Sequence, residues 1–404
     1  MRKIIITILI VAIIGSLGTI GYFIYNQNKT IIFPTTTTTV NSSPLFPIAS
    51  TTSGEVVNTG GTTTSSGMMG SAIGVPNRPE LSQMSIANLS TVLVGKNLIT
   101  IFVEKGTGNI YSLDNQNNMA RLSNTTLPGI GEAYLGSDTS GWRSILKQEK
   151  NGQITTYLGQ LKASLATSTG PSELRTTNWV NPLSVAVSPG SSKIAYLEQQ
   201  KDGSANLYTS DWSVKSSKKV WSSPLTEWSV TWPKDNILTI TSRASFDYPG
   251  ASYSLNLTNG QTKKILSDIN GLTIKSSPDN QRLVYSKSLL GGVSLYQYDL
   301  ATGTTRLLDL NTLPDKCAWL DNDILYCAVP KKIPSGNYPD DWYQGKTVFS
   351  DDIWRLDLKQ KTNTLAYSLK GNYDLSSFVI NKQAGWLYAL NKADNTLQAF
   401  SLRP

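Results

Sequence analysis

The residues whose types and spacing could do chemistry gather in one segment, residues 329–354, "VPKKIPSGNYPDDWYQGKTVFSDDIW". Four aspartates, Asp340, Asp341, Asp351 and Asp352, are interleaved in it with four of its five aromatic residues, Tyr338, Trp342, Tyr343 and Phe349. Carboxylates of this density could bind calcium, and the aromatic rings could contact a sugar or a peptide. The spacing of the acidic residues does not match an EF-hand loop. The alternative is structural: the aromatic side chains pin a long loop to its scaffold and the aspartates cap turns.

Other chemistry is limited by what the chain lacks. It contains no histidine, which excludes Ser-His-Asp triads, Cys-His pairs and metal sites built on imidazole. The net charge is +8, but Lys and Arg occur singly in turns and not in runs. This distribution does not favour nucleic-acid binding. We expect no metal, no other cofactor and no catalytic residues.

Cys317 and Cys327 are the only cysteines, and they flank the segment "AWLDNDILY". A hairpin centred on Asn322 places them directly opposite each other on one face of a sheet. Opposite residues lie close enough for a disulfide, which an exported domain can form. Two buried free thiols are the alternative.

The N-terminal segment indicates export. Residues 4–25 are uncharged and mainly apolar, long enough to cross a hydrocarbon core of about 30 Å as a helix. Arg2 and Lys3 precede them, so we expect residues 1–29 to form a signal anchor with a cytoplasmic N-terminus. A signal peptide cleaved near Ser16-Leu17-Gly18 is the alternative. Both interpretations place the remainder of the chain outside the membrane.

Residues 30–79 have the composition of a linker. They are rich in Ser, Thr, Gly and Pro, and Glu55 and Arg78 are almost their only charged residues. A flexible coil of this length has a root-mean-square span of roughly 35–45 Å. We therefore expect a stalk that holds a domain, residues 80–404, away from the membrane.

That domain contains seven similar units. Each has short strands of alternating polarity separated by turn residues, and most units are about 42–52 residues apart. Their second strands are predicted to begin at Asn97, Arg143, Lys193, Asn236, Arg282, Asp323 and Trp386. Four strands per unit at this spacing predict an all-β, seven-bladed β-propeller with four-stranded antiparallel blades.

Two of these units resemble a known family. "VAVSPGSSKIAYLEQQKDGSANLY" and "IKSSPDNQRLVYSKSLLGGVSLYQYDL" are similar to the Ser-Pro-Asp-Gly-like turn and the following strand of TolB-like and WD-related propeller repeats. The Gly-His and Trp-Asp signatures of true WD repeats are absent. The resemblance implies an architecture and transfers no catalytic residue.

The seventh unit ends after its third strand, near Leu397. An open sheet edge is a liability that closed propellers avoid. We therefore expect residues 80–88, "ELSQMSIAN", to supply the missing outer strand and to close the ring.

The longest loops lie on one side of the predicted disc. Loops between second and third strands share that side with the connections between blades, and we expect long ones at residues 167–182, 242–252 and 329–352. Recognition residues concentrate on such loops when a rigid scaffold holds them. The candidate ligand-binding residues are Trp179, Phe246, Tyr248, Tyr338, Asp341, Trp342 and Tyr343.

Together these features predict a membrane-tethered, extracytoplasmic propeller that acts as an interaction module for an envelope protein, peptide or glycan. One alternative is an exported carbohydrate-active enzyme, which would need two carboxylates about 5–10 Å apart at the mouth of the channel. A second alternative, which the TolB-like resemblance implies, is an accessory subunit of an envelope complex.

Overall fold

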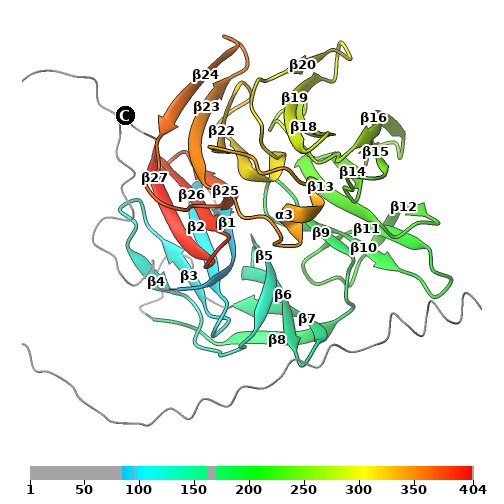
Figure 1. Cartoon of the computed structure of the whole chain (residues 1–404). Coiled ribbons are helices and arrows are strands. Elements are labelled where there is room, and N and C mark those ends of the chain that lie inside the picture. Colours follow the sequence, from blue (N-terminus) through cyan, green and yellow to red (C-terminus); the bar gives the residue numbers. More distant parts are fainter. Residues whose placement is uncertain (1–83, 95, 162–169, 403–404) are drawn as a thin grey trace, which may run out of the picture. The chain divides into compact units, whose positions relative to one another are not determined.

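Seven β-sheets arranged around a central axis form the domain (Figure 1), and each is a blade of a β-propeller. The computed structural model describes residues 84–94, 96–161 and 170–402, all within one compact unit, Ser66–Pro404. The predicted signal anchor, residues 4–25, and the predicted linker, residues 30–79, lie outside the described residues. Among the residues that are described, no helix is long and apolar enough to cross a membrane.

Within a blade, consecutive strands pair antiparallel and the first strand is innermost. Blades 1–3 comprise β1 (Ile86–Val94), β2 (Asn97–Glu104), β3 (Ile110–Leu113) and β4 (Met119–Arg121); β5 (Ile130–Asp138), β6 (Gly141–Lys150), β7 (Gln153–Leu161) and β8 (Leu174–Trp179); and β9 (Ser184–Val187), β10 (Lys193–Gln199), β11 (Ala205–Asp211) and β12 (Lys218–Ser223). Blades 4 and 5 comprise β13 (Trp228–Lys234), β14 (Ile237–Ser242), β15 (Pro249–Asn256) and β16 (Thr262–Asn270); and β17 (Ile274–Ser276), β18 (Arg282–Leu289), β19 (Gly292–Asp299) and β20 (Thr305–Leu307). Blades 6 and 7 comprise β21 (Cys317–Trp319), β22 (Ile324–Pro330), β23 (Asp351–Asp357) and β24 (Thr362–Tyr367); and β25 (Leu375–Asn381), β26 (Trp386–Asn391) and β27 (Thr396–Ser401).

Two short helices interrupt this pattern. The 3-10 helix η1 (Pro314–Lys316) precedes blade 6, and α3 (Asp340–Tyr343) lies in the long connection between β22 and β23. The predicted seven-bladed, all-β fold is confirmed.

The Ser-Pro turns of blades 3 and 5 are held by the same hydrogen bond. Ser188 Oγ accepts from the backbone N–H of Lys193 at 3.0 Å, and Ser277 Oγ accepts from that of Arg282 at 3.1 Å. In both turns a non-glycine residue takes a positive φ, Ser191 at 59° and Asn280 at 54°. The repeated sequence therefore specifies a hairpin in which the serine supplies the acceptor that closes the turn.

Packing between blades buries most of the apolar side chains of the inner and second strands. Ala195, Leu207, Leu238 and Ile240, for example, are completely buried between blades 3 and 4. Each buried aliphatic side chain stabilises the ring by roughly 1.5–3 kcal/mol relative to an exposed one.

The register predicted for the cysteines is confirmed. Cys317 on β21 lies directly opposite Cys327 on β22, and the structure joins them in a disulfide with their Cα atoms 4.0 Å apart. The bond lies in the core between blades 5 and 6, next to Leu325 and Leu356.

The prediction for ring closure is wrong from Ile86 onward. Ile86–Val94 forms the innermost strand of blade 1 and pairs with β2, so it is not available to blade 7. Residues 80–83 lie outside the described part of the chain. Within the described part, blade 7 has three strands and its sheet shares none with blade 1.

Side chains join blades 7 and 1 instead. Asn381 donates to the carbonyl oxygen of Leu98 at 2.9 Å, and Gln383 accepts from the N–H of the same residue at 2.7 Å. The backbone N–H of Ile86 donates to the carbonyl oxygen of Asn395 at 2.9 Å. A shared apolar cluster completes the junction: Ile86, Leu89, Phe102, Leu113, Tyr388, Leu390 and Leu397.

Candidate functional site

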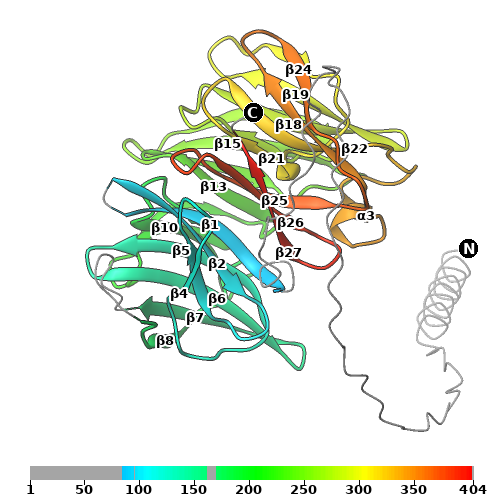
Figure 2. The same cartoon turned by 90° about the vertical axis from the view of Figure 1, so that its left-hand side faces the viewer.

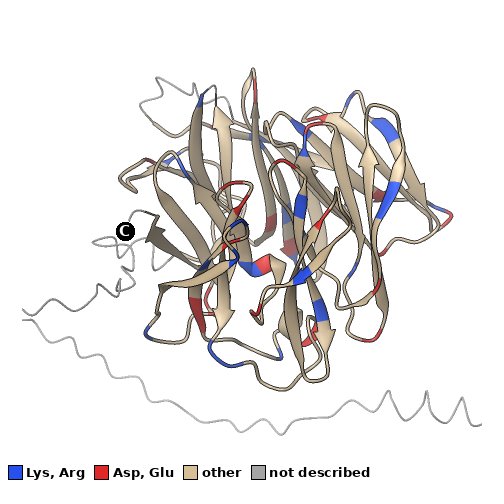
Figure 3. Cartoon of the chain, turned by 90° about the horizontal axis from the view of Figure 1, so that it is seen from above, with Lys and Arg blue, Asp and Glu red and all other residues tan. Residues whose placement is uncertain are grey.

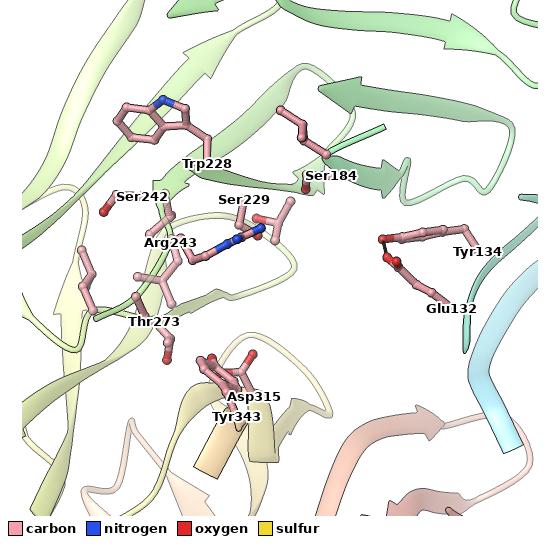
Figure 4. Close-up of a pocket in the computed structure, with 16 residues that line it drawn as sticks. Glu132, Tyr134, Ser184, Trp228, Ser229, Ser242, Arg243, Thr273, Asp315 and Tyr343 are labelled. Carbon is pink, nitrogen blue, oxygen red and sulfur yellow. Dashed lines mark hydrogen bonds between the residues drawn. The ribbon is translucent and has the colours of Figure 1, made fainter. Parts of the chain in front are cut away.

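A pocket of about 490 Å³ opens at the centre of the ring on the side that carries the second-to-third-strand loops and the connections between blades, which we call the loop face. Its volume lies in the range of pockets that bind small molecules. Blades 2 to 6 contribute to it (Figure 4), and its lining residues include Glu132, Tyr134, Ser184, Trp228, Ser229, Thr231, Ser242, Arg243, Thr273, Asp315 and Tyr343.

The wall from blade 4 follows from strand periodicity. Val230 and Trp232 of β13 are buried in the core between blades, so the alternating residues Ser229 and Thr231 face the pocket and are exposed. Neither of these two hydroxyls has a hydrogen-bond partner among the residues that the structure describes. They are available to a ligand.

Two carboxylates line the pocket, and each accepts a hydrogen bond from a tyrosine (Figure 4). Tyr343 on α3 donates to Asp315 Oδ2 at 2.7 Å, and Tyr134 donates to Glu132 Oε1. Burial of both hydroxyl groups, reinforced by the adjacent carboxylates, raises the pKa of Tyr343 and of Tyr134 well above the usual value. Both tyrosines therefore stay protonated and remain hydrogen-bond donors at any physiological pH.

Charged partners surround these groups. Lys147 Nζ lies 2.8 Å from Glu132 Oε2, and Arg243 Nη1 lies 2.9 Å from Glu227 Oε2. Lys275 lines an adjoining cavity of about 350 Å³ that it shares with Asp315, and it donates to the carbonyl oxygen of Cys317. Burial lowers the pKa of Lys275, and the carboxylate of Asp315 opposes that shift.

The insertion of blade 6, residues 331–350, is anchored by a buried ion network. Lys316 Nζ lies 2.8 Å from Asp351 Oδ2, 2.6 Å from Asp374 Oδ1 and 2.8 Å from the carbonyl oxygen of Leu375. All three charged side chains are fully buried. The indole N–H of Trp342 donates to Asp374 at 3.0 Å, so the network fixes α3 to the start of blade 7.

Asp351 is the least satisfied member of this network. Its Oδ1 is buried without a hydrogen-bond partner, while Oδ2 accepts from Lys316 and from the N–H of Leu375. Burial raises the pKa of Asp351 to about 6, even though the charge of Lys316 opposes the shift. The network thus contains a carboxyl group that titrates near neutral pH.

The insertion also crosses over blade 5 to reach blade 4. Ser288 on β18 donates to the carbonyl oxygen of Tyr338, and Asp340 Oδ2 accepts from the N–H of Phe246 at 2.6 Å. A side chain at Gly271 would collide with Ser288 and with the backbone of Tyr338. Tyr343 is thereby held at the edge of the central pocket.

Two of the predicted ligand-contact residues are not exposed, which corrects the sequence-based expectation. Tyr338 and Trp342 pack with Phe349, Val293 and Leu313 in the interior of the insertion. Phe349 and Trp342 also face the ammonium group of Lys316 at 5.2 and 5.0 Å. For these aromatic residues the structure agrees with the alternative interpretation, in which they pin the loop to its scaffold.

The other candidates lie at or near the loop face. Tyr248 and Tyr343 are 75% and 45% exposed, and Phe246 is half-buried beside the insertion. Asp341 accepts from the N–H of Asn337 at 2.7 Å. Trp179 belongs to the outer strand β8 and not to a long loop, and its ring packs edge-on against Tyr196 at 4.9 Å.

The sequence-based reasoning missed Glu132, Trp228, Arg243 and Asp315. Each is a single residue of a different segment, and none belongs to a local motif. The only signal that could have found them is position, because Glu132, Trp228 and Asp315 lie at the beginnings of inner strands or just before them.

Exposed apolar side chains are concentrated on the loop face. The described residues include eleven large exposed ones, and eight of these lie in loop-face turns or connections or beside them: Ile154, Val180, Leu225, Tyr248, Leu289, Leu290, Tyr343 and Val348. Leu307 and Leu365 are on outer strands, and Leu93 alone lies at the opposite face. Charged residues of both signs are instead distributed around the blades (Figure 3).

Within the described ranges, no group of three or more Asp, Glu or Cys side chains could hold a metal ion. The two carboxylates of the pocket come from blade 2 and from η1, on non-adjacent parts of the ring.

Comparison with known proteins identifies the fold only. No family model matches the chain, and no curated protein matches its sequence. An oligogalacturonate lyase from Vibrio parahaemolyticus aligns in structure with a TM-score of 0.51 and 11% identity, over 78% of this chain and 89% of that one.

Two further solved structures are more distant. TolB from Acinetobacter baumannii aligns over 72% of this chain and 65% of its own, with 11% identity and a TM-score of 0.41. The β-propeller domain of the Trilobed protease from Pyrococcus furiosus aligns over 64% and 78%, with 12% identity and a TM-score of 0.42. TolB and other β-propeller proteins are thus among the solved structures to which this chain is similar.

Proposed function

We propose that the protein is a membrane-tethered, extracytoplasmic interaction module that binds an envelope protein, peptide or glycan on its loop face. One observation carries the proposal: eight of the eleven large exposed apolar side chains of the described residues lie on that face. Exposed apolar groups around a central pocket are typical of a surface that a partner covers. The tether is residues 4–25, and the linker allows the propeller to reach its ligand.

The experiment compares two exposed leucines on opposite faces. Leu290, at the tip of the turn between β18 and β19, is fully exposed, and Leu93, near the turn between β1 and β2, is 38% exposed. Full-length protein carrying Leu290→Ser or Tyr248→Ala should retain much less native envelope material in affinity capture than the unmodified protein does. Each substitution is expected to cost about 1 kcal/mol or more, the threshold for an interface residue that matters.

The control variants carry Leu93→Ser, Asn259→Ala or Thr302→Ala on the opposite face and should capture as much material as the unmodified protein. If these variants lose binding while the loop-face variants keep it, the proposed face is wrong. Protease added to cells that lack an outer envelope barrier tests the tether: it should remove the propeller and leave a short membrane-embedded fragment.

The pocket also supports a second candidate, a carbohydrate-active enzyme, because Glu132 and Asp315 both line it. In that case Glu132→Gln and Asp315→Asn would each abolish hydrolysis of an oligosaccharide substrate. If the protein is only an interaction module, neither the unmodified protein nor the two variants should hydrolyse the oligosaccharide.

A further inference from the structure

The charges around the central pocket limit the kind of ligand it can hold. Glu132 is paired with Lys147 at 2.8 Å, and Arg243 is paired with Glu227 at 2.9 Å. Asp315 forms no salt bridge with a described residue, and Lys275 in the adjoining cavity interacts with it electrostatically. A strongly anionic ligand would therefore find no unpaired cation among the described residues that line the pocket, and its desolvation would go uncompensated.

The hydrogen-bonding groups that remain free are of complementary kinds. Asp315 Oδ1 is an acceptor without a donor among the described residues, because Tyr343 occupies only Oδ2. Arg243 has donors left on Nε and Nη2. Ser229 and Thr231 add two hydroxyls, each able to donate and to accept. Such a set suits a ligand whose own groups are hydroxyls, because a hydroxyl can satisfy any of these partners.

An aromatic residue borders this polar surface. Tyr343 lines the pocket from α3, is 45% exposed and is fixed by its hydrogen bond to Asp315 Oδ2. Its ring offers apolar surface to a C–H face of the ligand. The ring of Trp228 does not do so, because it donates to Ser223 Oγ at 3.0 Å and packs edge-on against Trp221 and Tyr253 at 5.5 and 6.0 Å, between blades 3 and 4.

We propose that the central pocket is a binding site for a neutral saccharide, with Asp315, Arg243, Ser229 and Thr231 binding its hydroxyl groups and Tyr343 contacting one face of a sugar ring. This inference rests on the proposed function and specifies the ligand class of its pocket. It places the carbohydrate-specific contacts in the central pocket and leaves the apolar loop tips for the remainder of the partner.

The test is isothermal titration of the full-length protein with five probes. Maltotriose, cellotriose and chitotriose represent neutral sugars, trigalacturonate represents an acidic sugar, and trialanine represents a peptide. The protein is kept in lauryldimethylamine oxide, because glycosidic detergents would occupy the site. We expect at least one neutral trisaccharide to bind more tightly than trigalacturonate and trialanine.

Matched variants locate the binding. Asp315→Asn removes a charged acceptor from the pocket with almost no change in shape, and it should weaken the best neutral trisaccharide by about tenfold. Asp235→Asn, in the turn between β13 and β14 on the opposite face, should leave the affinity unchanged. Tyr343→Ala should also weaken binding, with the thermal transition of each variant measured to verify folding.

The proposal is overturned if no neutral trisaccharide binds, if trigalacturonate or trialanine binds more tightly, or if Asp315→Asn and Asp235→Asn behave alike. None of these outcomes decides whether the loop face binds envelope material, which the capture experiment tests separately. If envelope capture still depends on Leu290 and Tyr248 while no sugar binds, the loop face is an interaction surface and the saccharide assignment is wrong.

Discussion

Replacing Lys316 by methionine should destabilise the propeller severely and release the blade 6 insertion. The side chain is fully buried, and among the described residues its ammonium group is the only cation within hydrogen-bond distance of Asp351 and Asp374, at 2.8 and 2.6 Å. Methionine fills a similar volume but leaves two carboxylates buried without a counter-charge. Removal of one partner from a buried ion pair costs about 3–5 kcal/mol.

Calorimetry of the full-length protein measures this loss. At about 2 °C per kcal/mol, the expected decrease in Tm is roughly 6–10 °C. Trypsin provides a local measurement, because Lys332 and Lys346 lie in the insertion and are exposed. Cleavage there should accelerate in Lys316→Met, since Trp342 loses the ammonium group over its ring and Asp374, to which Trp342 donates, loses its counter-charge.

Two comparisons make the prediction refutable. Lys234→Met, which changes an exposed lysine at the end of β13, should have no measurable effect. The triple variant Lys316→Met, Asp351→Asn, Asp374→Asn should recover most of the lost stability, because no unpaired charge remains. An unchanged Tm in Lys316→Met, or a triple variant no more stable than the single one, would refute the assignment of a structural role to this ion network.

Three further predictions concern the pH response, the disulfide and the junction of the ring. The pKa of Asp351 in the folded protein is raised to about 6, so its contribution to stability is present below about pH 4 and is lost as the pH rises through about 6. Asp351→Asn, titrated by denaturant at pH 5 and pH 7.5, should therefore gain about 1 kcal/mol relative to the unmodified protein between these pH values, and a constant difference would contradict the raised pKa. Thiol labelling of denatured, unreduced protein should find neither Cys317 nor Cys327 free, and changing both to serine should cost roughly 2–3 kcal/mol because the bond closes a loop between residues ten apart. Asn381→Ala removes hydrogen bonds to Leu98 and Thr100 at 2.9 and 3.1 Å and should cost about 1–3 kcal/mol in denaturant unfolding, whereas a negligible loss would show that the apolar cluster alone joins blades 7 and 1.

The parts of this fold that could be predicted from the sequence are those encoded locally. The hairpin of Cys317 and Cys327, the Ser-Pro turns and the seven units each depend on residues within about twenty positions of one another. The side of the disc on which each loop lies could also be predicted, because consecutive strands of a blade reverse direction at each hairpin.

The outer strand β8 shows where such reasoning fails. Residues 175–178 are all exposed, so the segment has no apolar alternation and was interpreted as a loop. An outer strand packs little of its surface against the core, and its pairing with β7 supplies most of what orders it. Composition therefore cannot distinguish it from a turn.

The pocket and the ion network could not be predicted because their members come from distant segments. Glu132, Arg243 and Tyr343 meet only after blades 2, 4 and 6 are assembled. Lys316 similarly finds Asp374 across 58 positions of sequence. Aspartates and aromatic residues in the insertion could be recognised as unusual, but whether they face solvent or the core depended on this distant lysine.

The blade 6 insertion contacts three other blades, and Figure 2 shows its helix α3 near β22 of blade 6 and β25 of blade 7. It binds blade 4 through Phe246, blade 5 through Ser288 and blade 7 through Lys392, so it links blades 4–7 into one arc of the ring, whereas blades 1–3 form an arc without such a link. Asp315 and Tyr343 belong to the linked arc of blades 4–7, and Glu132 and Tyr134 belong to the arc of blades 1–3. A ligand that contacts both tyrosine–carboxylate pairs would therefore connect the two arcs. Occupancy should then slow amide hydrogen exchange most at the blade 7–blade 1 and blade 3–blade 4 seams, far from the atoms that the ligand contacts.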